Sequence, residues 1–580
     1  MKTNKKISKL VTTAVMAVIA AAPSYAQTNI GVACGCPPLA SRPTVSLSTL
    51  PNTVLTTTAG TQGFELTNSV SLTCDKTWIL DGKIYVAPGK VMNIQPGTVI
   101  KALAVATPSN ATALVIERGA KIIANGTDEC PIVFTALADP MDGTYSYANK
   151  GQWGGLVILG KATNNLSLAA NGPYVAGGAG KLAVADGLGT IEGFATTNPQ
   201  DRYGANISGA VVAGEPAGAV AFDDNDNSGI LRFVSVRFSG AVLAVGAEIN
   251  GITLGSVGRG TTIDHVEIIA SADDNIEFFG GTVDVKYVSA LFGNDDMFDY
   301  DLGWSGRAQF LFGMKGNTSF SADSDNGYEA DSDDQKSNNL PKAKPVCFNA
   351  TFIGNPKTVL TSDNSSIAAI NAKEATGGEI YNSIFANFKN GLNLVNTISG
   401  TRAVNQEAYH NWTNTVLSPA NPYAGILKVK CNTFVGVTNP LTVNSTASLT
   451  TAADNTQFTT TDNNIIVAGN TLAGFDYNFV INGTTNGYAS NADVIPAVSA
   501  NISTAGCPTT PIDGFFSATD YRGAFNPNGE NWLNEGTYSA LIGSVKGLAG
   551  CPTDLDKDGD TDIDDYLKFL PEFGTLCPGN

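Results

Sequence analysis

The sequence predicts an all-β protein: a right-handed parallel β-helix, or solenoid, followed by a small C-terminal module of a calcium loop and a helix. Three observations predict this fold. The chain has 62 glycines in 580 residues, and helical periodicity is almost absent between about residue 70 and residue 500. Apolar and polar residues alternate with a period of two, as where Leu427, Val429 and Cys431 enclose two lysines. An acidic motif also recurs along the chain.

The recurring motif gives the length of one coil. Asp273-Asp-Asn-Ile-Glu-Phe-Phe-Gly returns as Asp295-Asp-Met-Phe-Asp-Tyr-Asp-Leu-Gly after 22 residues, and a third copy begins after a further 30. That third copy begins at Asp325, and the stretch from Asn250 matches the same turn and strand. The stretches from Asn349, Asn382 and Asn432 look like one other coil position repeated. One turn of a parallel β-helix requires a repeat of about this length. An array of β-sandwiches would instead show hairpin turns and no fixed offset.

The N-terminus predicts export. Four lysines precede an apolar run from Leu10 to Ala22, and Ser24-Tyr25-Ala26 has the form of a cleavage site, so residues 1–26 read as a signal peptide. We therefore expect a secreted protein, extracellular or on the outer cell surface. No later stretch is long and apolar enough for a transmembrane segment. Removing the four lysines changes the formal charge from −18 to about −22, which excludes nucleic acid as a partner.

The domain boundaries follow from composition. We expect an N-terminal extended or cap segment at 27–70, a β-helix at 71–500, a cap or linker at 501–548, and a calcium-loop unit at 549–580. The stretch from Gly143 to Gly229 should hold loops that leave the solenoid. A β-helix exposes its terminal coils and needs covers at both ends.

All nine cysteines follow the signal peptide, where an oxidising compartment permits disulfides. The spacing favours Cys551–Cys577 and Cys74–Cys130. Because connectivity does not follow from sequence, the remaining pairs stay open. The open candidates are Cys347 with Cys431, and Cys34 with either Cys36 or Cys507. The odd count leaves one thiol over unless it pairs between chains.

The C-terminal segment from Asp554 to Asp565 has the spacing of an EF-hand calcium loop. Its predicted ligands are Asp554, Asp556, Asp558, Asp560 and Asp565. Calcium needs six to eight oxygens, so alternate carboxylates must converge, and Gly559 permits the sharp turn that brings them together. Calcium is therefore the cofactor that we expect, in a unit bracketed by Cys551 and Cys577.

Several stretches of the sequence resemble those of a known group of proteins. They are Cys74-Asp-Lys-Thr-Trp-Ile-Leu-Asp-Gly-Lys-Ile-Tyr-Val, Ile94-Gln-Pro-Gly-Thr-Val-Ile-Lys, Gly151-Gln-Trp-Gly-Gly-Leu-Val-Ile-Leu-Gly and Asp273-Asp-Asn-Ile-Glu-Phe-Phe-Gly-Gly-Thr-Val-Asp-Val-Lys-Tyr. Residues 70–335 resemble a group of secreted β-helix proteins of Bacteroidota and some marine proteobacteria. This resemblance implies an exported or surface protein and no particular reaction. The tail resembles one half of a dockerin, which uses two such loops where this chain has one.

The acidic pairs Asp273/Asp274 and Asp295/Asp296 should form a column roughly 5 Å apart per coil. We favour a structural interpretation, in which these carboxylates bind backbone amides or calcium. The alternative is a glycoside hydrolase site, whose carboxylates would be Asp274, Glu277, Asp296 and Asp299. Polygalacturonase-like β-helices also place paired aspartates on a coil, but their His-containing and Arg-x-Lys signatures are missing here. The acidic stretches 223–226 and 323–334 are further candidate calcium sites.

The other residue types limit the chemistry. With only two histidines, His265 and His410, a Ser-His-Asp triad and a multi-histidine zinc site are improbable. His265 beside Asp264 reads as a residue at a coil edge. The aromatic residues Trp78, Trp153, Trp304, Tyr300 and Tyr328 could form a sugar-stacking platform, although aromatics also fill β-helix cores. Of these, Trp304 lies beside the acidic column in the sequence.

Two functions follow from these observations. The first is an exported structural, adhesive or assembly-forming surface protein, with a stiff β-helix and a calcium-stabilised tail. Its partners would be copies of itself, through end-to-end or lateral contacts, or a cell-surface glycan or protein. The alternative is a β-helix that binds or degrades polysaccharide through its edge carboxylates.

Overall fold

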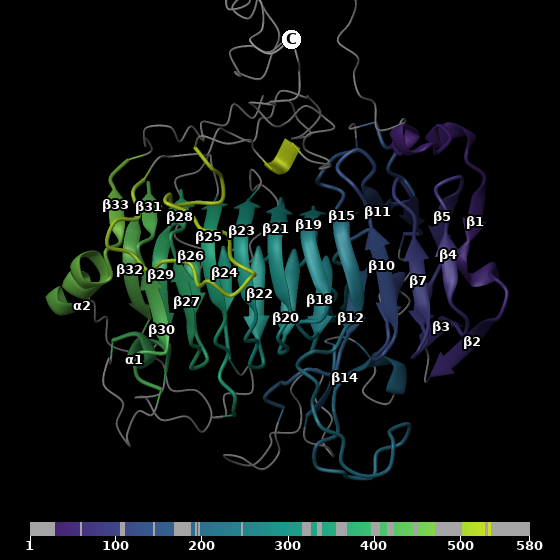
Figure 1. Cartoon of the computed structure of the whole chain (residues 1–580), viewed down its shortest axis with the longest axis horizontal. Coiled ribbons are helices and arrows are strands. Elements are labelled where there is room, and N and C mark those ends of the chain that lie inside the picture. Colours follow the sequence, from purple (N-terminus) through teal and green to yellow (C-terminus); the bar gives the residue numbers. More distant parts are fainter. Residues whose placement is uncertain are drawn as a thin grey trace, which may run out of the picture.

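The computed structural model describes residues 30–58, 61–104, 111–142, 145–166, 187–191, 194, 198–244, 247–315, 326–332, 339–354, 368–395, 407–413, 423–444, 451–469, 502–527 and 532–534. They form an elongated stack of parallel strands, which confirms the predicted β-helix (Figure 1). Within these ranges, no helix is long and apolar enough to cross a membrane.

Two large sheets build the stack. The 12-stranded sheet contains β2 (Thr53–Thr58), β3 (Thr61–Leu66), β6 (Lys83–Val86), β9 (Ala113–Ile116), β12 (Gly155–Leu159), β18 (Ile252–Gly255), β20 (Ile276–Phe279), β22 (Phe298–Asp301), β24 (Tyr328–Ala330), β26 (Ala368–Ala372), β29 (Asn390–Val395) and β32 (Asn439–Asn444). The 17-stranded sheet contains β1 (Thr44–Ser46), β4 (Val70–Leu72), β5 (Thr77–Leu80), β7 (Val91–Ile94), β8 (Val99–Ala102), β10 (Lys121–Asn125), β11 (Ile132–Ala136), β15 (Gly229–Arg237), β19 (Thr262–Ile269), β21 (Asp284–Leu291), β23 (Arg307–Met314), β25 (Val346–Ile353), β27 (Gly378–Tyr381), β28 (Ile384–Ala386), β30 (Leu427–Lys430), β31 (Thr433–Val435) and β33 (Ile465–Val467).

The remaining described elements are short. Two hairpins are formed by β13 (Leu188–Thr190) with β14 (Arg202–Gly204), and by β16 (Val242–Ala244) with β17 (Ala247–Glu248). The helices and helical turns are η2 (Val32–Cys34), η3 (Leu39–Ser41), η4 (Leu47–Thr49), η6 (Pro199–Asp201), α1 (Ala408–Thr413), α2 (Ala452–Thr456), the π-helical turn η8 (Gln457–Thr461) and η9 (Trp532–Asn534).

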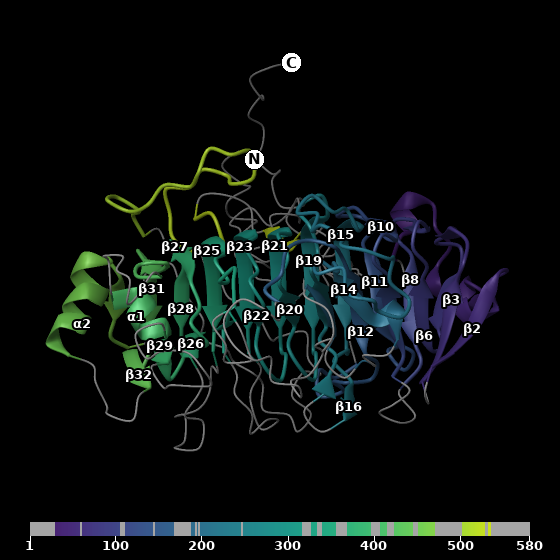
Figure 2. The same ribbon diagram turned by 90° about the horizontal axis from the view of Figure 1, so that it is seen from below.

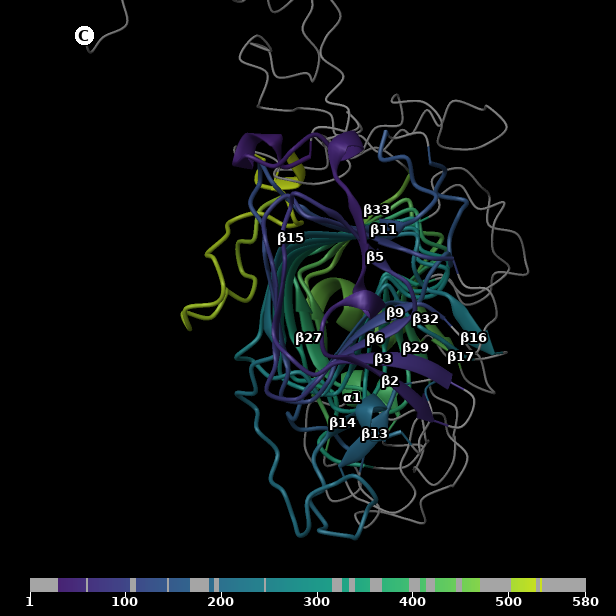
Figure 3. The same cartoon turned by 90° about the vertical axis from the view of Figure 1, so that its right-hand side faces the viewer.

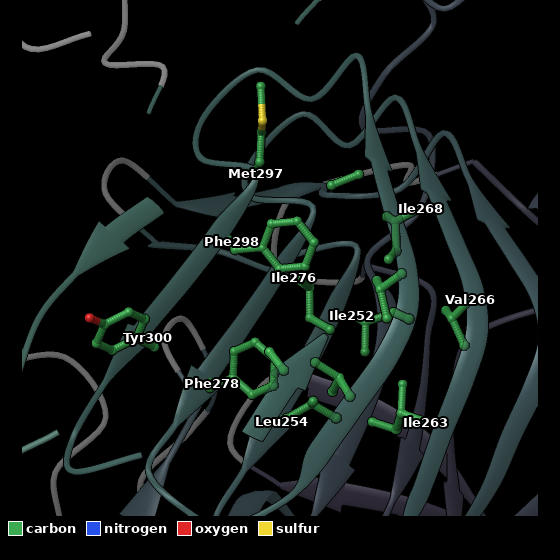
Figure 4. Close-up of a cluster of buried hydrophobic side chains, with 14 of the residues drawn as sticks. Ile252, Leu254, Ile263, Val266, Ile268, Ile276, Phe278, Met297, Phe298 and Tyr300 are labelled. Atoms are coloured by element: carbon green, nitrogen blue, oxygen red, sulfur yellow. The ribbon is translucent and has the colours of Figure 1, made fainter. Parts of the chain in front are cut away.

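Each rung of the β-helix takes one strand from the 12-stranded sheet and then one long or two short strands from the 17-stranded sheet. Alternate residues of each strand point inward, as Ile252 and Leu254 do in β18 (Figure 4). Their neighbours in the following rungs, Ile276 and Phe278, fall in register with them and join the same buried core. Stacking identical positions in this way fills the interior with large apolar side chains, which confirms the predicted alternation.

The rung register also aligns the corners. In the 17-stranded sheet the corner residues adopt the left-handed conformation, with φ between 47° and 58°. The aligned residues are Phe233, His265, Tyr287, Phe310, Asn349, Asn382, Cys431 and Asn463. Asparagine tolerates this conformation better than most residues. The predicted repeat of Asn349 and Asn382 is therefore confirmed, but Asn432 lies one position later, because Cys431 takes the corner.

The N-terminal end differs from the prediction in two respects. Parallel pairing begins inside the segment expected as a cap, at β1 in the 17-stranded sheet and at β3 in the 12-stranded sheet, where β2 pairs with β3 antiparallel as an edge strand. The predicted disulfide Cys74–Cys130 is wrong, because the disulfides are Cys34–Cys130 and Cys36–Cys74. The segment before β1 brings both of its cysteines against the first rungs, where each reaches a different partner.

A long insertion between β12 and β15 leaves the solenoid, as expected for the stretch from Gly143 to Gly229, although β12 itself belongs to a rung. Tyr203 of β14 packs over Gly255 and Phe279 on the outside of the 12-stranded sheet. Together with Leu166, it covers outward apolar residues of the first rungs, such as Val157. The insertion therefore shields the N-terminal half of this face.

Residues 502–527 lie along the outside of the 17-stranded sheet and not over its last rung (Figures 2 and 3). We name them the strap. Lys286 donates to the carbonyl oxygen of Phe515 at 2.8 Å, and Arg522 donates to that of Asn432 at 2.8 Å. The disulfide Cys431–Cys507 ties the strap to β30 and β31, so the suggested pair Cys347–Cys431 is wrong. Cys347 is a buried free thiol.

The C-terminal rungs lie next to the two α-helices. Helix α2 begins with a capping box, in which Thr451 and Asp454 each bond the other's backbone amide. Between α1, β30 and α2 lies a cavity of about 860 Å³, whose lining includes Lys428 and Lys430. Both lysines are ion-paired, with Glu379 and Asp462 respectively.

Candidate functional site

The outward row of the 12-stranded sheet changes from apolar to acidic along the stack. Because the register is unbroken from β12 to β32, one outward residue per rung forms a straight row. In order, the row is Val157, Thr253, Glu277, Asp299, Glu329, Asn371, Asn393 and Thr442. Glu277, Asp299 and Glu329 thus place three carboxylates on three successive rungs, and neighbouring strands in a sheet are about 4.8 Å apart.

A second row lies at the turn before these strands, where the corner residues Asn250, Asp274, Asp296 and Asn326 occupy equivalent positions. Asp274 Oδ1 accepts a hydrogen bond from the amide of Asp296 at 2.8 Å. Asp296 Oδ1 accepts one from the amide of Asn326 at 2.6 Å, and Asn326 Oδ1 accepts one from Ala368 at 2.9 Å. The side chains of Asp274, Asp296 and Asn326 therefore each cap the next rung, which is the structural role expected for the two aspartates.

The two rows meet at one cluster of acidic groups, which we name the carboxylate cluster: Asp274, Glu277 and Asp299. One oxygen of each of these carboxylates lies within 4.8 Å of the others. Asp274 is also grouped in this way with Asp273 and Asp295. Asp274 and Glu277 are buried, and the Oδ1 atom of Asp299 is sealed from solvent without a hydrogen-bond partner.

Two lysines neutralise the neighbours of this cluster. Lys373 contacts the carboxylate of Glu329 and lies 3.3 Å from Asp331. Burial lowers the pKa of Lys373, but Asp331 and Glu329 outweigh burial and raise it. Lys315 contacts the carbonyl oxygen of Asp295 and acts against the rise in the pKa of Asp296. Both lysines lie on the C-terminal side of the cluster.

Burial is the main reason that the pKa of each cluster aspartate lies well above its ordinary value. For Asp274 the further contributions come from Asp273, Asp299 and Asp296, which all raise it. For Asp299 they come from Glu277, Glu329 and Asp331, which also raise it. Like charges held together out of water favour protonation or a bound cation. This cluster can therefore share protons or bind a metal ion.

The remaining predicted site residues lie elsewhere. The expectation that the aromatic residues fill the core is confirmed and the alternative of a sugar-stacking platform is wrong, because all five are at most 5% exposed: Trp78, Trp153, Trp304, Tyr300 and Tyr328. The Trp304 ring stacks on Phe278 at 4.1 Å inside the core. His265 contacts Asp264 and stacks between Phe233 and Tyr287, as expected for a coil-edge residue. His410 lies in α1, remote in sequence from the carboxylate cluster.

Hydrogen bonds to backbone amides hold the acidic stretch 223–226. Asp223 accepts one from the nearby Asn225, and Asp224 accepts one from Thr163, at the start of the insertion. Among the described residues, the groups of three acidic side chains with close oxygens all include Asp274. Of the stretch 323–334, Glu329 and Asp331 belong to the outer face described above. The predicted ligands from Asp554 to Asp565, the pair Cys551–Cys577 and the signal peptide 1–26 lie outside the described residues.

Sequence reasoning missed Lys373, and it missed Asn250 and Thr253 as neighbours of the cluster. A signal for the last two was present, because Asn250-Gly-Ile-Thr aligns with Asp274-Asn-Ile-Glu. The register confirms this alignment, since Thr253 pairs with Glu277. No comparable signal pointed to Lys373, which is brought to the cluster only by the stacking of β26 on β24.

The family profile described as a pectate-lyase-like β-helix domain matches residues 64–192 and 186–478. These residues include nearly the whole stack of rungs, with the carboxylate cluster in the second matched segment. No curated protein matches the chain.

Proposed function

The chain belongs to the pectate-lyase-like β-helix family, and on that premise we propose that it is an exported structural protein of the cell surface whose β-helix serves as a stiff scaffold. One observation carries the proposal: the parallel ladder continues in register from β3 to β32 around a packed apolar core. A close-packed interior resists deformation, and every rung supports the next. Such a body suits spacing, adhesion or assembly.

Export is supported by the cysteines. Six described cysteines form three disulfides, which persist in oxidising compartments and are rare in reducing ones. Two of the disulfides fix the first rungs and one fixes the strap. The predicted signal peptide at residues 1–26 provides the route. We propose attachment to a surface glycan or protein, or to further copies of the chain, as the use of this scaffold.

Electron microscopy of the native protein tests the scaffold. We expect filaments, decorated cell surfaces or regular assemblies, together with binding of purified protein to intact cells or isolated glycans. A protein that stays monomeric with and without calcium, and binds neither cells nor glycans, would contradict this function.

For the tail, we propose that calcium bound by Asp554, Asp556, Asp558, Asp560 and Asp565 stabilises a terminal attachment unit. So many carboxylates in one loop repel each other without a cation. Chelation should then increase proteolysis after Gly550, an effect that Asp556→Asn with Asp558→Asn should reproduce in calcium. Cleavage after Gly550 that does not depend on calcium would argue against this role.

A second function is favoured by the carboxylate cluster. Carboxylates with strongly raised pKa values, close together on the outer face of a β-helix, are a candidate acid–base pair for a sugar bond. Polysaccharide turnover that is lost in Asp299→Asn and kept in Asp284→Asn would support an enzyme. If a panel of neutral and acidic polysaccharides is neither cleaved nor bound, this alternative fails and the scaffold remains.

A further inference from the structure

We propose that the free edge of strand β2 pairs with β2 of a second copy of this chain, so that the 12-stranded sheets of two copies join in one antiparallel contact. The inference rests on the proposed function and deepens it, because it names the partner in self-assembly and the surface that binds this partner. Strand β2 (Thr53–Thr58) lies at the N-terminal end of the stack (Figures 1 and 3). Within the described part of the chain, it pairs on one side only, with β3.

The side chains of β2 leave an inward-facing row uncovered at this end. Leu55 lies opposite Phe64, and Phe64 lies opposite Ile84, whose side chain is fully buried in the core. Leu55 therefore continues the inward row, yet it is 53% exposed. Val54, on the other face of the strand, is 49% exposed. These side chains leave apolar area that a partner can bury.

Strand β2 also lacks the features that protect an edge strand from pairing. Edge strands of natural sheets are commonly charged, interrupted by proline or a bulge, or very short. The chain has no charged residue from Pro43 to Phe64, β2 contains no proline, and its register with β3 is continuous over all six residues. No described strand covers the far side of β2, so its backbone N–H and C=O groups can pair with a further strand.

The other edges of the two sheets are protected. In the 17-stranded sheet, β1 has three residues and directly follows Pro43, and β33 also has three residues. In the 12-stranded sheet, the opposite edge strand β32 contains Pro440, which has no N–H to donate. The rings of Phe458 in η8 and Phe434 lie 5.3 Å apart, so η8 covers the core at that end. A head-to-tail stack would bring β2 against a protected edge, whereas pairing β2 with its own copy joins two unprotected ones.

Charge favours a second copy that meets the first at this end. The mature chain carries a formal charge of about −22, so two copies repel each other unless they meet where charge is balanced. From residue 30 to residue 80 the charges balance, with two basic and two acidic residues: Arg42, Lys76, Glu65 and Asp75. Strand β2 itself reads Thr-Val-Leu-Thr-Thr-Thr, so it meets its own copy without opposing like charges.

The symmetry of the contact follows from the two faces of β2. A twofold axis perpendicular to the sheet keeps both cores on the same side of the joined sheet, and it places one residue of β2 opposite its own copy. One pair of six-residue strands buries less area than the roughly 1,600 Å² of a standard stable interface. The dimer should therefore dissociate on dilution, and attachment of both copies to one surface should favour it.

Sedimentation velocity of the full mature chain over a range of micromolar concentrations tests the inference. We expect the wild type to shift from monomer to dimer as its concentration rises. Leu55→Lys places a charge on the edge strand and should stay monomeric at every concentration. Val211→Lys makes the matched change at a fully exposed residue of the insertion and should dimerise like the wild type. Among single cysteines placed in turn at residues 54 to 57, at least one should give a disulfide-linked dimer under mild oxidation, and Val211→Cys should not.

A chain that stays monomeric at all these concentrations would overturn the inference, and so would a dimer that Leu55→Lys leaves intact, since its contact would lie elsewhere. Circular dichroism shows whether each variant is folded. If Leu55→Lys does not fold, the cysteine variants decide, and the absence of a cross-linked dimer at all four positions would contradict the contact. A monomer that binds cells or glycans would overturn this inference alone and leave the scaffold function standing. A dimer that binds neither would support the inference and contradict the proposed attachment.

Discussion

The two outer faces of the β-helix handle charge in opposite ways. On the 17-stranded sheet, neighbouring rungs alternate in sign: Arg232 faces Asp264 at 3.7 Å, Arg307 bonds Asp284 at 3.0 Å, and Lys428 bonds Glu379 at 2.7 Å. On the 12-stranded sheet, Glu277, Asp299 and Glu329 repeat one sign over three rungs. Opposite charges directly across strands stabilise a sheet, and like charges destabilise it.

The contrast shows that the acidic row is not a by-product of the repeat. Rung stacking aligns whatever residue occupies a position, so a repeated motif aligns identical charges unless neighbouring copies diverge. One face pairs its charges between rungs. On the other face, the lysine contacts seen among the described residues, those of Lys315 and Lys373, lie on the C-terminal side of the carboxylate cluster. The four predictions that follow test whether this difference is energetic or only compositional.

The largest effect is expected where the acidic face loses its lysine. Lys373→Met should lower the free energy of unfolding by about 2 kcal/mol, because it leaves Glu329 and Asp331 without their counter-charge; its partial exposure limits the loss. The matched change Lys428→Met removes a more exposed pair and should cost less than about 1 kcal/mol. Urea unfolding of both variants measures the difference. Equal losses would mean that the two faces do not differ.

The second prediction concerns the sign of the change in the free energy of unfolding when one carboxylate on each face is neutralised. In chelator, Asp299→Asn should stabilise the protein by about 1 kcal/mol, because a neutral amide replaces a carboxylate surrounded by like charges. Asp284→Asn should destabilise it by about 1 kcal/mol, because Arg307 loses its partner. Both values come from unfolding in excess chelator. Destabilisation by both substitutions would remove the distinction.

The acidic face should contribute its own pH effect. The folded-state pKa values of Asp274 and Asp299 are raised above their unfolded values, so their contribution is fully present below about pH 4 and is lost as pH rises through the folded pKa. In chelator, this part of the stability should fall as pH increases from about 4. Comparing the thermal unfolding of the wild type with that of Asp299→Asn at several pH values isolates this contribution. A pH slope that Asp299→Asn leaves unchanged would assign the effect elsewhere.

The smallest effect is expected at the exposed end of the alternating face. Arg232→Gln should change the free energy of unfolding by less than about 0.5 kcal/mol, since the Arg232 side chain is 49% exposed and its ion pair is screened. The same measurement at high salt should show no difference between this variant and the wild type. A larger loss would mean that the alternating charges carry more of the stability than their exposure indicates.

The sequence predicted the fold because its repeat and its alternation report the same physical requirement. The 22-residue offset between Asp273 and Asp295 is one rung, and the third copy does align, with Glu329 opposite Asp299. The acidic row was therefore predictable from spacing alone. Its burial and the position of its counter-charge were not, because Lys373 and the insertion reach this face only through tertiary packing.

The disulfides and the strap could not be predicted for a related reason. Neither the segment that carries Cys34 and Cys36 nor the strap has a periodic pattern, and their positions depend on contacts with distant rungs. The order of the cysteines gives no information on which corner each one reaches. Trp304 lies in the core, as favoured for the aromatic residues, although its proximity in sequence to the acidic motif could not show which side of the strand it faces.

The position of the strap also determines where a mechanical force on the C-terminal part of the chain would act on the β-helix. Past the strap, Trp532 of η9 lies against Tyr287 and His265, with ring centroids 5.6 and 6.4 Å apart, so the last described residues leave the molecule near the middle of its long axis (Figure 1). Force transmitted through the C-terminus would therefore act as on a beam held at its centre. Both arms of the β-helix would project from that point.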